Sequence, residues 1–253
     1  MDTNSDIRNK IIIFDEYPHD YLKEYSDLEL AGIYSNNKNN FEIFEKLLYE
    51  KRNESQLITI LLIKIIMHVK KRANIDAVKL LIRYGADVNA INSNKLTLLM
   101  LCYFFLQNNI EILELLIENG ADVNIKNSQF QTTLMYSLRN VSSYDKLEIF
   151  KLFVRKENQI NSKDVFGDTA LMIYIRDNGQ LFIRYDIIKL LLDNKASIYI
   201  KNNKGVNIFN YLEERFGKQN YKNSDIYSLI FNYKNLHGDH FCEYDINFFY
   251  NYF

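Results

Sequence analysis

The chain has 253 residues, of which 47% are hydrophobic and 25% charged, and this composition excludes long intrinsic disorder. Its 31 basic and 32 acidic side chains give a net charge of −1, so the chain as a whole lacks the positive charge typical of nucleic-acid-binding proteins. The two cysteines, Cys102 and Cys242, do not imply a disulfide framework and favour a reducing compartment.

The N-terminal segment, MDTNSDIRNKIIIF, lacks the long apolar stretch and the small-residue cleavage site of a secretory signal. The most apolar stretch, residues 57–69, is too short to span a bilayer and contains Lys64. It is interpreted as a buried helix, and we therefore expect a cytoplasmic protein that does not bind a membrane.

Two apolar segments, DLELAGIY and FEIFEKLLYE, lie within residues 25–50 and are interpreted as the helices of a degraded first copy of a repeat. The first full copy is predicted over 58–89, with Thr59 in the place that a threonine takes in later copies. The second helix of this copy is predicted over 76–84, where apolar residues follow the i, i+3, i+4 spacing of a buried face. Gly85 comes just past that helix, where a left-handed C-cap favours a residue without Cβ.

The phrase LIRYGADVNA, 81–90, returns 35 positions later as LIENGADVNI, 116–125. A helix is again predicted before it, over 110–119, and Gly120 again follows the helix. A phrase that returns at a fixed interval is typical of a repeat architecture rather than of a catalytic motif.

A threonine opens the apolar segment after each turn: Thr97, Thr132 and Thr169 are separated by 35 and 37 positions. A threonine side chain accepts a backbone N–H at a helix start, so each is predicted as the N-cap of a first helix. The repeat unit is therefore a turn, a helix, a short loop, a longer helix and a glycine turn.

Weaker copies extend the repeat. Residues 146–161 and 187–199 match the second helix and its turn, with Glu157 and Lys195 in the glycine position. The helices of a last copy are predicted over 204–216 and 225–234.

The predicted division of the chain has three parts. Residues 1–52 form an N-terminal extension with a degenerate capping repeat, residues 53–203 form about four repeats, and residues 204–253 form a degenerate last repeat with an aromatic cap. Stacked repeats bury their apolar faces against one another, so the terminal ones need a cover. The core is predicted to include Leu81, Leu116, Phe153 and Leu191.

The short polar segments between the helices argue against a βαβ array, and the interruptions argue against a coiled coil, which needs unbroken heptads. The predicted fold is therefore all-α, a solenoid of stacked helix-turn-helix units.

The GADVN phrase after a leucine-rich helix, followed by a turn and T-x-L at the next helix, resembles the ankyrin repeat. The sequence departs from that family's T-P-L-H pattern at two positions, and its helix–helix loops ANI, NVSSYDK and DNGQLFIRY are longer than usual. The proline is replaced by Leu98, Thr133 and Ala170, and the histidine by Met100, Met135 and Met172. The methionines are predicted to pack between repeats. The sequence is divergent and rich in Asn, Lys, Ile, Tyr and Phe, which have AT-rich codons. In both respects it is similar to ankyrin proteins from large DNA viruses such as poxviruses and giant amoebal viruses.

The resemblance implies a non-enzymatic scaffold that binds a protein partner through its turns and first helices. First-helix positions Leu101, Tyr136 and Ile173 are candidates for the same surface, although Leu101 and Ile173 could equally be core. The turn residues that the resemblance assigns to partner contact are Ile91, Ser93, Asn94, Leu96, Lys126, Ser128, Gln129, Gln131, Lys163, Val165, Phe166, Asp168, Lys201, Asn203, Lys204 and Val206.

No phosphate-binding, dinucleotide-binding, zinc-protease or serine-hydrolase motif is present, so neither catalysis nor a cofactor is expected. His237, His240 and Cys242 could ligate zinc, but their spacing matches no standard site, and a turn before the aromatic cap is favoured. The basic segment VKKR, 69–72, is read as a surface loop rather than a site for RNA or an acidic partner, because no aromatic residues are interleaved with it.

The sequence thus predicts a monomeric module in the cytoplasm, or the host cytoplasm if the chain is viral, that binds a protein and no nucleic acid. In the viral case the partner would be a host protein. The alternative is an adaptor that recruits its bound protein to a ubiquitin ligase or other host machinery.

Overall fold

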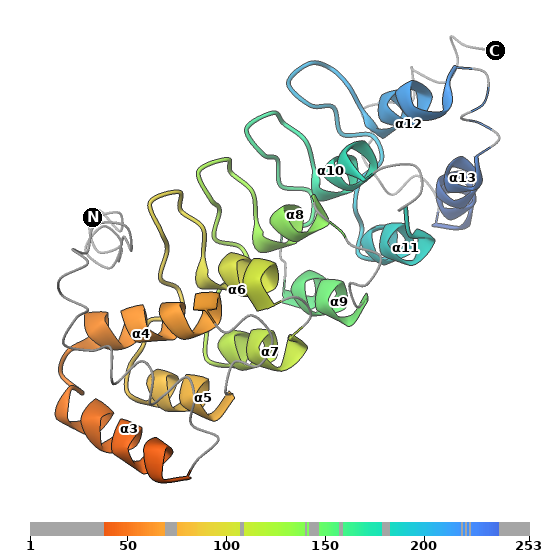
Figure 1. Cartoon of the computed structure of the whole chain (residues 1–253). Coiled ribbons are helices and arrows are strands. Elements are labelled where there is room, and N and C mark those ends of the chain that lie inside the picture. The colour runs from red at the N-terminus through yellow and green to blue at the C-terminus, as the bar shows by residue number, and fades with distance from the viewer. Residues whose placement is uncertain are drawn as a thin grey trace. The chain divides into compact units, whose positions relative to one another are not determined.

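The computed structural model describes residues 38–68, 75–106, 109–139, 141, 147–156, 159–178, 183–218, 220, 222 and 224–237. These residues form eleven α-helices, α3 to α13 (Figure 1). The chain divides into two compact units. Unit 1 spans residues 1–128 and unit 2 spans residues 129–253.

Unit 1 is built from two layers of helices. Helix α4 packs on α5 and α6, and α7 packs on α5 and α6, while α3 lies against α5. The helices are α3 (Lys38–Glu50), α4 (Ser55–His68), α5 (Ile75–Arg83), α6 (Leu98–Leu106) and α7 (Ile110–Glu118).

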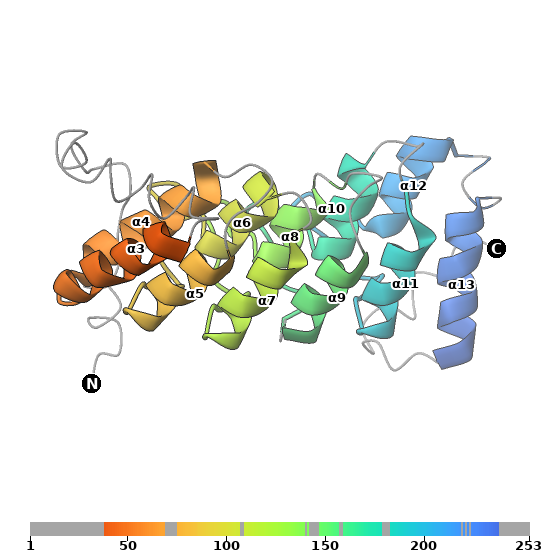
Figure 2. The ribbon, with the colours of Figure 1, turned by 60° about the horizontal axis from the view of Figure 1, so that its bottom comes forward.

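Unit 2 repeats the same arrangement. Figure 2 shows α8, α10 and α12 in one row and α9, α11 and α13 in another. The helices are α8 (Thr133–Leu138), α9 (Leu147–Lys156), α10 (Ala170–Asp177), α11 (Tyr185–Asp193), α12 (Ile208–Phe216) and α13 (Asp225–His237). The predicted all-α fold of stacked helical pairs is confirmed.

The core of each unit lies between its two layers. All four predicted core residues are fully buried, and so are the three methionines that stand in the histidine position. Burial of a leucine or phenylalanine side chain stabilises the folded chain by about 1.5–3 kcal/mol relative to its exposure. The spacing of apolar residues therefore identified the faces that the helices bury.

Three threonines cap the first helices as predicted. Thr97 Oγ1 accepts from the amide of Met100 at 3.3 Å, and Thr132 and Thr169 accept in the same way at 3.4 Å. In the last copy, Asn207 replaces the threonine and forms a capping box with Asn210.

Thr59 differs from these caps. Helix α4 begins at Ser55, so Thr59 lies in the second turn and donates to the carbonyl oxygen of Ser55 at 2.8 Å. Its Oγ1 also accepts from the amide of Asp87 at 2.8 Å. The threonine of the first copy thus joins α4 to the turn after α5 instead of capping a helix.

The second helices end in left-handed turns, as the glycines predicted. Gly85 and Gly120 have φ values of 93° and 92°, and Lys195 keeps this geometry with φ 67° although it has a Cβ. In each case the next amide bonds back to the helix; that of Ala196, for example, donates to the carbonyl of Leu191 at 3.0 Å. The corresponding Glu157 lies outside the described residues.

The division at 1–52, 53–203 and 204–253 stays a prediction. The N-terminal extension up to residue 37 and the aromatic segment 238–253 lie outside the described residues.

Candidate protein-binding fingers

Each loop between a second helix and the next first helix is called a finger here. The first finger is residues 86–96, the second 121–131, the third 159–168 and the fourth 196–206. The third and fourth fingers extend side by side from the same edge of unit 2 (Figure 1).

An Asn or Asp side chain folds the finger turn back on itself. Asp164 Oδ1 accepts from the amides of Phe166 and Asp168 at 2.9 and 3.0 Å. Asn202 Oδ1 accepts from the amides of Lys204 and Val206 at 2.9 and 3.0 Å. Short polar side chains that bond to the backbone ahead of them are typical of tight turns, so the sequence itself builds the tip.

A left-handed residue follows each tip. Lys95 and Phe130 have φ values of 57° and 59°, whereas the third and fourth fingers have Gly167 (φ 81°) and Gly205 (φ 75°) in the same position. Gly167 is also needed for space, because a Cβ there would lie 2.5 Å from Oδ1 of Asn203.

Backbone hydrogen bonds join neighbouring fingers in unit 2. The amide of Val165 donates to the carbonyl of Gln129 at 3.0 Å, and the amide of Asn203 donates to that of Phe166 at 3.0 Å. Asn203 Nδ2 also donates to the carbonyl of Val165 at 3.0 Å. These bonds hold the finger tips in a fixed spacing.

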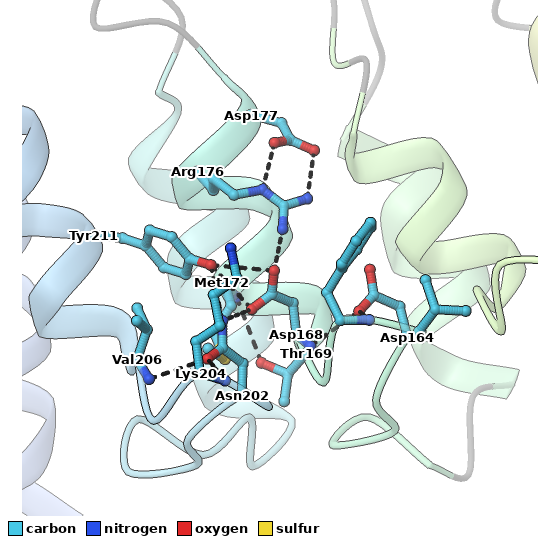
Figure 3. A network of polar contacts seen from close by, with 12 residues as sticks. Asp164, Asp168, Thr169, Met172, Arg176, Asp177, Asn202, Lys204, Val206 and Tyr211 are labelled. Atoms are coloured by element: carbon cyan, nitrogen blue, oxygen red, sulfur yellow. Dashed lines mark hydrogen bonds and ion pairs between the residues drawn. The ribbon is translucent and has the colours of Figure 1, made fainter.

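A buried polar network fixes the bases of the third and fourth fingers (Figure 3). Asp168 is fully buried and accepts from Asn202 Nδ2 at 2.8 Å, from the Tyr211 hydroxyl at 3.1 Å and from Arg176. Arg176 also donates to both oxygens of Asp177, at 2.6 and 2.9 Å. Its bonds to Asp177, together with the charges of Asp177 and Asp168, raise the pKa of Arg176, so it stays charged.

Asp164 is buried at the edge of this network. Its Oδ2 has no hydrogen-bond partner in the described part of the chain. Burial therefore raises the pKa of Asp164, and the nearby charge of Asp168 acts in the same direction. The amides of Asp168 and Phe166 and the charge of Arg176 oppose this rise in pKa.

The structure places most of the predicted contact residues on the surface. Leu96, Lys126, Tyr136 and Val206 are half-buried. The exposed ones are Ser93, Asn94, Ser128, Gln129, Lys163, Val165, Phe166, Lys201, Asn203 and Lys204.

Three of the predicted contact residues have buried side chains, so the structure does not present them to a partner. Ile91 forms an isolated antiparallel bridge with Thr97, and Asp168 belongs to the buried network. Gln131, like Asp168, directly precedes the capping threonine, and this position points into the stack rather than to the tip. The two open candidates, Leu101 and Ile173, are also core residues.

Phe130 is a candidate contact that sequence reasoning missed. Its side chain is 60% exposed. In the neighbouring third finger, Phe166 and Val165 are 52% and 40% exposed. The available signal was a bulky apolar residue in a position where two other fingers have glycine.

The described residues offer little other chemistry. Burial raises the pKa of the Cys102 thiol and so disfavours the reactive thiolate. Among these residues no group of three or more His, Cys, Asp or Glu could hold a metal ion. The side chains of the predicted His237, His240 and Cys242 cluster, and the segment 69–72, lie outside the described residues. No described helix has the length and apolarity needed to cross a membrane.

Two family models match the chain. Residues 32–127 match a model of three ankyrin repeats, and residues 166–203 match a model of a single ankyrin repeat. The matched ranges together cover more than half of the chain. No curated protein matches it.

Proposed function

Because the chain belongs to the ankyrin-repeat family, whose domains are generally protein-interaction modules, we propose that it is a non-enzymatic scaffold that binds a protein partner through the finger tips of unit 2. The contact surface, called the tip patch here, consists of Phe130, Val165 and Phe166.

The exposure of these three apolar side chains on a fixed backbone carries the proposal. Aromatic residues, phenylalanine included, are enriched in protein interfaces relative to the rest of the surface. The hydrogen bonds between Gln129 and Val165 and between Phe166 and Asn203 hold the tips before a partner arrives. A partner therefore loses little binding free energy to the ordering of this surface.

The backbone at Phe130 supports the same conclusion. A left-handed conformation costs a residue with a Cβ about 1–2 kcal/mol. Phe130 does not recover this through core packing, because most of its side chain faces solvent. The fold does not need a phenylalanine here, because Lys95 takes this conformation in the first finger and glycine takes it in the third and fourth, so contact with a partner supplies a reason for the exposed ring.

Affinity capture with variants of the full chain tests the proposal. The double variant Phe130→Gly/Phe166→Ser removes both aromatic tips of unit 2, whereas Asn94→Ser/Lys95→Gly changes the first finger and is the matched control. We expect proteins captured by the wild-type chain to be retained by the control and lost from the double variant. Equal capture by both variants would show that the tip patch is not the binding surface.

The adaptor alternative has a distinct outcome in the same experiment. An adaptor would recover components of a ubiquitin ligase, or other host machinery, and this recovery would persist when the tip patch is removed. A simple binding module would recover only proteins whose capture depends on the tip patch.

A further inference from the structure

The turns that open the fingers differ in charge between the two units. In unit 1, Asp87 and Asp122 follow the helix turn, and Asp122 Oδ1 accepts from a backbone amide two residues ahead at 2.9 Å. In unit 2 the same position holds Gln159 and Ser197, and Ser197 Oγ accepts from the corresponding amide at 3.3 Å. The turn keeps its hydrogen bond in the fourth finger but loses its carboxylate.

The third and fourth fingers present only positive charge to solvent. Their lysines, Lys163, Lys201 and Lys204, are all exposed. Their two acidic residues, Asp164 and Asp168, are both buried. The exposed surface of these fingers therefore has three cationic side chains and no anionic one.

The positive charge lies beside the tip patch. Lys163 Nζ donates to the carbonyl oxygen of Lys201 at 2.8 Å, which brings the two lysine positions together on neighbouring fingers. Val165 and Phe166 follow Lys163 within the same finger. Lys204 directly follows Asn203, whose amide is bonded to the carbonyl of Phe166. Apolar anchors and cations thus occupy one continuous edge.

We propose that this edge recognises an acidic protein segment that carries apolar side chains. The apolar side chains would contact Phe130, Val165 and Phe166, and the carboxylates would face Lys163, Lys201 and Lys204. Opposite charges across an interface raise the association rate and discriminate against basic partners. This inference rests on the proposed function, because it specifies the partner of the same surface.

Selection from a random displayed-peptide library on the full chain tests the inference. We expect the selected peptides to combine Asp or Glu with apolar residues. The charge reversal Lys163→Glu/Lys201→Glu/Lys204→Glu should weaken their binding at least about tenfold, and added salt should weaken wild-type binding. The reversal Lys95→Glu in the first finger is the matched control and should leave the dissociation constant unchanged. Circular dichroism checks that each variant is folded.

The remaining outcomes separate this inference from the proposed function. Neutral or basic peptides that bind the lysine variant normally and are lost with Phe130→Gly/Phe166→Ser would overturn the acidic partner and leave the tip patch in place. Peptides that bind all finger variants equally would overturn both. A library that yields no binding peptide would overturn recognition of a segment.

Discussion

The first finger in unit 1 and the third finger in unit 2 have the same backbone and opposite surfaces. Asn92 and Asp164 fold the two turns, and each turn ends with a left-handed residue and a capping threonine. The tip of the first finger is the polar pair Ser93–Asn94, whereas the third finger exposes Val165 and Phe166. The same turn therefore carries a hydrophilic tip in one unit and an apolar tip in the other.

This difference separates what the fold requires from what it allows. The turn needs a short polar acceptor, a residue that tolerates positive φ and a helix cap. The two tip positions lie between the polar acceptor and the residue with positive φ. They have no such requirement, because they neither pack in the core nor cap a helix. The stability of the fold therefore does not explain the apolar tip of the third finger.

The largest effect on stability is expected in the core of each unit. Leu116→Ala in unit 1 and Leu191→Ala in unit 2 each remove a fully buried side chain, so each should lower the free energy of unfolding by about 2–5 kcal/mol. Urea denaturation measures both. An unchanged transition midpoint in either variant would contradict the core assignment in that unit.

A smaller effect distinguishes the two finger glycines of unit 2, Gly167 and Gly205. Gly205→Ala meets no neighbouring atom within 4 Å and should cost about 1–2 kcal/mol for the left-handed backbone alone. Gly167→Ala has the same backbone penalty and also collides with Asn203, so it should unfold at lower temperature than Gly205→Ala. Equal thermal midpoints would show that the third and fourth fingers are not held as closely as described.

Asp164→Asn tests how the buried carboxyl of the third finger affects the free energy of unfolding. The first finger has Asn92 in the same position. Because the pKa of Asp164 is raised, the folded chain binds its proton more tightly than the unfolded chain does. This carboxyl adds to the free energy of unfolding below its ordinary pKa, and the contribution is lost as pH rises through the raised value. Asparagine can accept the same amide hydrogen bonds but does not titrate.

We therefore expect Asp164→Asn to be more stable than the wild-type chain at neutral pH, with a smaller difference in acid. Urea denaturation at a series of pH values measures this. A difference in stability that does not change with pH would contradict the described burial of Asp164.

The smallest effect on stability is expected at the tips. Lys95→Gly and Phe130→Gly both relieve a left-handed residue, but glycine loses more backbone entropy on folding, so each should change the free energy of unfolding by less than about 1 kcal/mol. Partner binding should fall only for Phe130→Gly. A large loss of stability in Phe130→Gly would mean that the phenylalanine serves the fold, and the contrast between the two fingers would then lose its functional meaning.

The sequence predicted the helices, the glycine turns and the threonine caps because these depend on residues a few positions apart. Two copies of GADVN set the spacing, and Lys195 could be recognised as a glycine equivalent from that spacing alone. Asp168 could not be placed in this way, because its partners Asn202 and Tyr211 follow it by 34 and 43 positions. A polar residue in a turn is expected to face solvent until such partners are known.

The candidate site was predictable in part for a similar reason. Phe166 stands between two turn residues, and its exposure follows from the position. Phe130 occupies the left-handed position, where a glycine is expected and a contact residue is not; the sequence has a phenylalanine in this glycine position, but its 60% exposure follows only from the structure.

Photo-crosslinking shows directly whether the finger tips of unit 2 contact a partner protein. Benzoylphenylalanine is introduced into the full chain at position 130 in one protein and at position 95 in another, and each is irradiated in the presence of a cell lysate. We expect a covalent adduct with a partner protein at position 130, reduced by Phe166→Ser, and no such adduct at position 95. An adduct at position 95 and none at position 130 would contradict the assignment of binding to the tips of unit 2.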